Sequence, residues 1–155
     1  MKVSISKTNN VDNVSINSID ELEHDVREHK KHVKEVMCEL SYQLRRIGLS
    51  HDWTKIYYLD DFYNDVKLRQ DEIDFKKRSW YDIHTRSERH HLNTHTPDDV
   101  NLLDVFEFIV DCVCAGKSRS GDVDYGFLEF DNPELLEKAY WNTVRFVDVL
   151  VELNE

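Results

Sequence analysis

Residues that break helices are rare in this chain, and their scarcity limits the folds open to it. Four glycines and two prolines are spread over 155 residues. A β-sandwich or barrel needs many tight turns, for which glycine and proline are the usual residues, whereas a few long helices need almost none. The sequence therefore predicts an all-α protein with one helical domain of about five helices over residues 18–155. A short polar tail or small hairpin is expected over residues 1–17.

Capping signals and apolar periodicity place the first helices. Ser18 and Glu21 form a capping box before a helix that is expected to end near Gly48. A short helix and a connection are expected within residues 51–63. A further helix is expected over about 71–89.

Two more start signals lie in the second half of the chain. Thr96-Pro97 combines an N-cap residue with a proline at the first helical position, and Gly116 is a natural stop for the apolar helix that follows. Pro133 begins the last predicted helix, with Asp131 or Asn132 as its cap.

Charge and cysteine usage exclude several classes of protein. Twenty basic residues against 31 acidic ones give a net charge of −11, so a general nucleic-acid binder is disfavoured. No stretch approaches the roughly 18 apolar residues of a membrane helix, and the N-terminal residues do not contain the apolar core that a secretory signal peptide needs. The three cysteines include no Cys-x-x-Cys pair. These features favour a cytoplasmic protein that does not bind membranes.

His51 and Asp52 are adjacent, and Lys55 follows about one helical turn later. Neutral imidazole and carboxylate are ligands that divalent metals accept, and a neighbouring pair can chelate one ion or bridge two. The Lys55 ammonium can project over the same site and neutralise a phosphate oxygen. By itself the dipeptide is common and often no more than a helix cap. Its interpretation therefore depends on the residues that accompany it.

Histidines accompany this pair on both sides. His29 lies on the apolar stripe of the first predicted helix and is expected to face the core, whereas His32 is rotated off that stripe. His84, Glu88 and His91 share one face of a later helix with Trp80, at spacings of four, four and three. If that helix persists, His90 points about 100° away. A satisfied core histidine and a solvated polar face are the simpler alternatives.

Asp104, Glu107 and Asp111 form a narrow acidic stripe on an otherwise apolar helix. Surface helices usually have a broader polar face that also carries basic residues. Crowded carboxylates repel one another unless a cation lies between them or some are protonated. We expect Glu107 and Asp111 to share a ligand or to hydrogen-bond a ligating histidine.

The order of these elements resembles that of the HD-domain metal-dependent phosphohydrolases, and His51-Asp52-Trp53-Thr54-Lys55 matches their HDxxK form. The chain looks more similar still to a family of small phage and bacterial proteins. Their pattern combines HDxSK, Trp-x-x-x-His, a His-His pair and a Glu-x-x-x-Asp helix, and the match covers roughly residues 29 to 120. Thr54 stands where the usual residue is serine.

The resemblance implies an HD-domain-like helical fold that binds one or two divalent ions, such as Mn, Fe, Mg, Co or Zn. The metal ligands that it implies are His29, His51, Asp52, His84, His91 and Asp111. The supporting or alternative ligands are His32, Glu88, His90 and Glu107. The resemblance implies Lys55 as a phosphate contact, and under the same hypothesis Arg89, Lys117 and Arg119 could hold further phosphates.

The leading hypothesis is a phage-encoded, metal-dependent phosphohydrolase acting on a nucleotide or related phosphate ester. Asp52 would orient or deprotonate the attacking water, and Lys55 would stabilise phosphoryl charge. Trp53 or Tyr57 could stack a base, although core packing is the simpler role of any one aromatic. The rival hypothesis is a non-catalytic acidic phage protein that binds a host protein, with the histidines and acids as a structural metal site.

Overall fold

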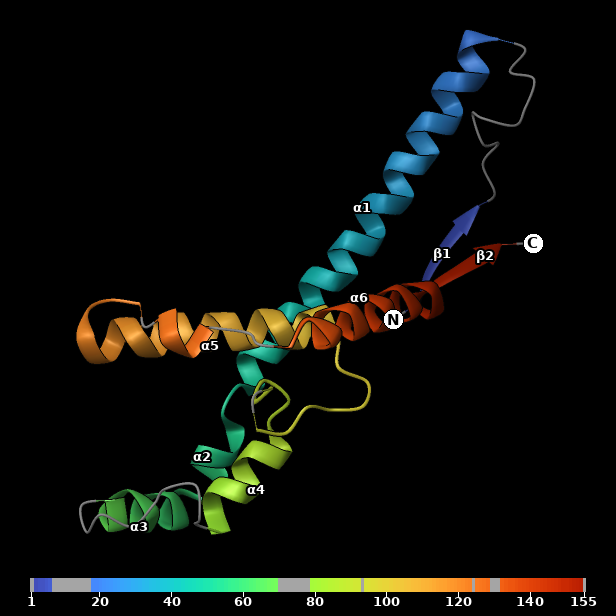
Figure 1. Ribbon diagram of the computed structural model, residues 1–155. Coiled ribbons are helices and arrows are strands. Elements are labelled where there is room, and N and C mark those ends of the chain that lie inside the picture. The colour runs from blue at the N-terminus through green and yellow to red at the C-terminus, as the bar shows by residue number, and fades with distance from the viewer. Residues whose placement is uncertain are drawn as a thin grey trace. The chain divides into compact units, whose positions relative to one another are not determined.

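The computed structural model describes residues 2–6, 18–69, 79–92, 94–123, 125–128 and 132–154. Helices dominate these residues, which confirms the all-α prediction (Figure 1). The α-helices are α1 (Ile19–Ser50), α2 (Trp53–Tyr57), α3 (Leu59–Arg69), α4 (Ser79–Ser87), α5 (Leu102–Ser120) and α6 (Pro133–Leu150), with a 3-10 helix at Tyr125–Leu128. Among the described helices, none combines the length and apolar character needed to cross a membrane.

The chain divides into two compact units. The first unit contains residues 1–46 and 143–155, and the second contains residues 47–142. Both boundaries fall inside helices, within α1 and within α6.

The first unit joins the two ends of the chain. Strand β1 (Val3–Ser6) pairs in parallel with β2 (Val151–Asn154), and Val3 lies opposite Val151. Residues 7–17 of the predicted tail or hairpin lie outside the described residues. Residues 3–6 form a strand, and its partner is residues 151–154.

Helix α1 starts as predicted but ends later. The Glu21 backbone N–H donates to Ser18 Oγ at 3.2 Å, so Ser18 caps the helix. The helix continues to Ser50, and Gly48 does not adopt the left-handed conformation of a helix-ending glycine. The predicted stop at Gly48 is therefore wrong by two residues.

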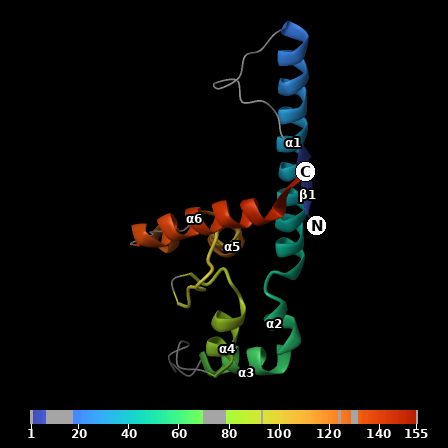
Figure 2. The same ribbon diagram turned by 90° about the vertical axis from the view of Figure 1, so that its right-hand side faces the viewer.

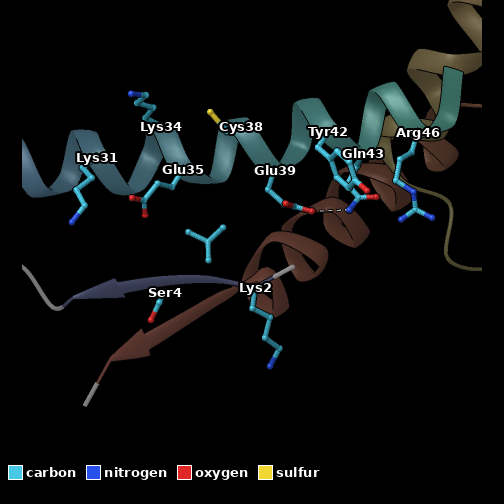
Figure 3. A pocket seen from close by; sticks show the side chains of 11 residues that line it. Lys2, Ser4, Lys31, Lys34, Glu35, Cys38, Glu39, Tyr42, Gln43 and Arg46 are labelled. Carbon is cyan, nitrogen blue, oxygen red and sulfur yellow. Dashed lines mark hydrogen bonds between the residues drawn. The ribbon is translucent and has the colours of Figure 1, made fainter. Parts of the chain in front are cut away.

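The face of α1 that turns inward also differs from the prediction. His32 is buried and His29 is exposed, the reverse of the expectation from the apolar stripe. Glu39, two turns after His32, is buried as well and lines a cavity of about 850 Å³ between α1 and β1 (Figure 3). The inward face is thus the one that carries Glu39, and the apolar stripe at Val26 and Val33 is exposed.

The core of the second unit forms where α5 meets the first half of α6. Figure 2 shows α6 passing across α5, which is seen there nearly along its axis. Its buried members are Leu92, Val100, Val105, Phe108, Leu135 and Ala139. The Leu135 backbone N–H donates to Asn132 Oδ1 at 3.2 Å, which confirms Asn132 as the cap of α6.

The boundaries of α5 differ from the prediction at both ends. Asn101, not Thr96, is its N-cap, in a capping box with Asp104. The Thr96 hydroxyl donates instead to the Leu92 carbonyl at 2.8 Å. At the other end the helix passes Gly116 and stops at Gly121, whose φ of 79° is the left-handed conformation that glycine adopts freely. Residues 117–120, which follow the predicted stop at Gly116, therefore form the last turn of α5.

Candidate metal centre

The turn between α1 and α2 carries the His51-Asp52 pair. Asp52 has a φ of 57°, in the left-handed region that aspartate tolerates better than most residues. This conformation ends α1 and starts α2 at Trp53. His51 Nε2 lies 3.4 Å from Asp52 Oδ2, and the Lys55 ammonium pairs with the same carboxylate oxygen. The three residues are therefore brought together as the sequence predicted.

The acidic stripe of α5 meets His51. Its Nδ1 is 2.9 Å from Glu107 Oε1, and its Nε2 is 3.4 Å from Asp111 Oδ1. Contact with Asp111, and then with Glu107, raises the pKa of His51 to about 10. Burial disfavours the charged form of Glu107, but its contacts with His51 and His90 outweigh this and lower the pKa of Glu107 to about 2. Two carboxylates of the stripe, those of Glu107 and Asp111, therefore lie against the His51 imidazole.

His90 reaches the same place from the segment after α4. Because α4 ends at Ser87, the helical geometry that would have turned His90 away does not apply. His90 is 1% exposed, and its Nδ1 lies 3.2 Å from Glu107 Oε1. Its Nε2 lies 3.8 Å from Asp52 Oδ1 and 3.9 Å from Asp111 Oδ2.

His84 and His91 complete the cluster. Their Nε2 atoms are 2.7 Å apart, and His84 Nε2 is 3.6 Å from Asp52 Oδ1. The His84 ring stacks on Trp80, with ring centroids 4.8 Å apart. Burial, followed by the charge of Lys55, lowers the pKa of His84 to about 4. Burial, followed by the charge of His90, lowers the pKa of His91 to about 3. Both rings are therefore neutral at pH 7 and able to offer a lone pair.

These side chains fit a divalent metal. Four overlapping groups bring their ligand atoms within 4.8 Å of one another. The groups are His51/His90/Glu107, Asp52/His90/His91, His51/Asp52/Asp111 and Asp52/His84/Glu88.

Two orphaned atoms give independent support to this fit. Within the described residues, Asp52 Oδ1 and His90 Nε2 are buried without a hydrogen-bond partner. Buried polar atoms are rarely left unsatisfied, because the cost is about 1–3 kcal/mol for each group. A cation held between Asp52 and His90 would satisfy both. The donor set of imidazoles and carboxylates suits transition-metal ions such as Mn, Fe, Co or Zn.

The remaining histidines of the predicted ligand set lie in the other unit. His29 and His32 are both on the part of α1 that belongs to the first unit, and neither is in the four groups. The ion-pair partner found for His32 is Glu28, at 3.7 Å.

All four predicted phosphate contacts have partners within the described residues, and Lys55 has its own in Asp52. Arg89 pairs with Asp104 and Asp99, Lys117 with Asp122, and the Arg119 guanidinium donates to the Ala115 carbonyl. The structure brings Lys55 to the metal-ligand cluster, and places Lys117 and Arg119 in the last turn of α5.

The fold and the site together define a class: an all-α protein with a cluster of histidines and carboxylates that can hold a divalent ion. The chain belongs to a family described as a family of unknown function (DUF5662), whose sequence pattern matches residues 18–142. That span contains every residue of the cluster. Neither a curated protein nor a solved structure matches the chain.

Glu107→Gln is expected to weaken divalent-metal binding by about 10–100-fold. The charged carboxylate accepts a hydrogen bond from His51 Nδ1 and orients the ring, whereas a neutral amide holds it less strongly. Calorimetric titration with Mn²⁺ or Zn²⁺ measures the change. Glu137→Gln, at an exposed position on α6, is the matched control and should bind as the wild type does. Equal affinities for all three proteins would show that Glu107 does not support the ligands.

Proposed function

We propose that the protein is a divalent-metal-dependent phosphohydrolase that acts on a nucleotide or a related phosphate ester. One observation supports this proposal more than the others. Some side chains of the metal-ligand cluster are buried and others are partly exposed, and Lys55 lies beside the exposed ones. The side chains of His84 and His90 are almost fully buried. Those of His51, Asp52 and Asp111 are 21–27% exposed, and that of Lys55 is 33% exposed. A substrate can therefore approach the carboxylates beside a cation.

The proposed mechanism uses the partly exposed residues at the cluster, and Asp52 has two tasks in it. A bound divalent ion would supply Lewis acidity toward water and phosphoryl oxygens. Asp52, Asp111 and His51 would hold that ion together with the buried histidines. The Lys55 ammonium, which now pairs with Asp52, would turn to a phosphoryl oxygen of the substrate and stabilise its charge. Asp52 would orient the attacking water and accept its proton.

Asp52→Asn tests this proposal without disturbing the backbone. Asparagine also tolerates the left-handed conformation found at residue 52, so the turn is retained while the charge is lost. Release of phosphate from a panel of nucleotides with Mn²⁺ is expected to fall by at least about 100-fold. Asp61→Asn, at an exposed position on α3, should leave the rate unchanged. Far-ultraviolet circular dichroism checks that all variants keep their helical content.

Two results would contradict the proposal. Undiminished turnover by Asp52→Asn would place the chemistry elsewhere in the chain. Metal binding by the wild type with no turnover of any nucleotide or phosphate ester would favour the alternative, a non-catalytic acidic protein that binds a basic partner. The net charge of −11 supports that alternative.

A further inference from the structure

Thr54 lies behind the metal-ligand cluster and is fully buried, at 0% exposure. It is the second residue of α2, directly after the His51-Asp52 turn. Its hydroxyl donates to Glu88 Oε1 at 2.8 Å, and the Thr54 backbone N–H donates to the same oxygen at 3.0 Å. The hydroxyl oxygen also lies 2.6 Å from His84 Nδ1. Glu88 and His84 are themselves buried.

These contacts fix the position of the proton on the His84 ring. A threonine hydroxyl has one hydrogen to donate, and here it goes to the Glu88 carboxylate. The hydroxyl can therefore only accept a hydrogen bond from His84, which requires a proton on Nδ1. A neutral imidazole with Nδ1 protonated has its lone pair on Nε2.

The lone pair points toward the cluster. His84 Nε2 lies 2.7 Å from His91 Nε2 and 3.6 Å from Asp52 Oδ1, on the side of the ring opposite Thr54. The other tautomer would put a proton at this position and exclude a metal ion from it. It would also leave two acceptors, His84 Nδ1 and Thr54 Oγ1, facing each other in a buried site where no water can pair with them.

We propose that Thr54 is a positioning residue: with Glu88, its hydroxyl holds His84 in the Nδ1–H tautomer and so presents the Nε2 lone pair to the metal. This inference rests on the metal site of the proposed function. Thr54 belongs to none of the four candidate ligand groups, and its proposed effect on the metal acts only through His84. The role requires a hydroxyl but not a methyl group, so serine at this position should serve equally well.

Thr54→Val and Thr54→Ser form a matched pair for the test. Valine keeps the shape of threonine without the hydroxyl, and serine keeps the hydroxyl without the methyl group. Both keep the backbone N–H that donates to Glu88. Two-bond ¹H–¹⁵N spectra of the metal-free full-length chain report the His84 tautomer, with the His84 signals assigned from a His84→Gln variant. Calorimetric titration with Zn²⁺ reports the affinity.

The wild type and Thr54→Ser are expected to show the Nδ1–H tautomer, with zinc affinities within a few-fold of each other. Thr54→Val is expected to lose the tautomer preference and to bind zinc about 10–100-fold more weakly. An unchanged tautomer and affinity in Thr54→Val would overturn the proposal. An Nε2–H tautomer of His84 in the wild type would also overturn the proposal. This measurement tests the proposal even if Thr54→Val does not fold. Failure of the wild type to bind any metal would defeat the proposed function, while the tautomer spectra would still measure the effect of Thr54 on His84.

Discussion

Arg89→Ala is expected to lower the free energy of unfolding of the metal-free protein by about 3 kcal/mol. Arg89 binds both oxygens of Asp104, through Nε at 2.7 Å and Nη2 at 2.8 Å. Asp104 is 2% exposed, and the Asn101 backbone N–H is its other hydrogen-bond donor. Without Arg89, a buried carboxylate would keep a single neutral hydrogen bond. The expected loss is at the low end for a broken buried pair, because the Arg89 side chain is itself 42% exposed.

Arg86→Ala is the matched control for this prediction. Arg86 pairs with Asp82 one turn away on α4, but both side chains are more than half exposed. Exposed pairs of this kind contribute only about 0.3–0.5 kcal/mol. Urea unfolding followed by circular dichroism compares the two variants, and Arg89→Lys should fall between them because lysine loses the two-pronged contact. Similar losses in Arg86→Ala and Arg89→Ala would show that the Arg89–Asp104 pair contributes no more than a surface pair.

The Arg89–Asp104 pair also matters for the geometry of the cluster. Arg89 directly precedes His90 in the chain, and Asp104 lies in the first turn of α5, one turn before Glu107. The pair therefore ties the segment that supplies two histidines to the helix that supplies two carboxylates. Arg89→Ala should accordingly weaken metal binding as well as stability.

The second large effect is expected from the metal itself. At a free concentration about 1,000 times its Kd, a divalent ion should raise the free energy of unfolding by about 4 kcal/mol. For a chain of this size the midpoint of thermal unfolding should then rise by about 10 °C. The ligands come from three separate segments, at residues 51–52, 84–91 and 107–111, and only the folded chain brings them together. An unfolded chain therefore competes poorly for the ion.

Thermal unfolding with Mn²⁺ or Zn²⁺, against a chelated reference, measures this stabilisation. Asp52→Asn should lose most of the shift, because Asp52 belongs to three of the four ligand groups. His24→Ala removes an exposed histidine of α1 and should keep the whole shift. A shift of equal size in Asp52→Asn would place the bound ion outside the cluster.

Local periodicity was enough to predict part of the cluster. Glu107 and Asp111 are one turn apart on one long helix, so their common face follows from the helical repeat alone. The inward position of His90 did not follow, because it depends on α4 ending at Ser87. Helix ends are decided by a few capping contacts, and these are harder to read from sequence than a periodic face.

Contacts between distant segments explain the other differences. The sequence analysis predicted Arg89 as a phosphate contact and placed Asp104 in the acidic stripe. Nothing in the sequence indicated that these two side chains form an ion pair. On α1, periodicity identified an apolar stripe, but which face turns inward is set by packing with the rest of the first unit. Thr54 carried one signal in the sequence: the HDxSK pattern has a hydroxyl at this position, and threonine retains it.

The pairing of β1 with β2 has a consequence for the order in which the chain folds. Val3 and Val151 are 148 positions apart, since 151 − 3 = 148, so their contact closes a loop that spans nearly the whole sequence. Closing so long a loop costs more chain entropy than closing a short one. The β1–β2 contact adds little stability until the intervening helices have formed. During synthesis β1 must wait until residues 151–154 have left the ribosome. The metal-ligand cluster, complete by residue 111, needs no such delay and can assemble while the chain is still growing.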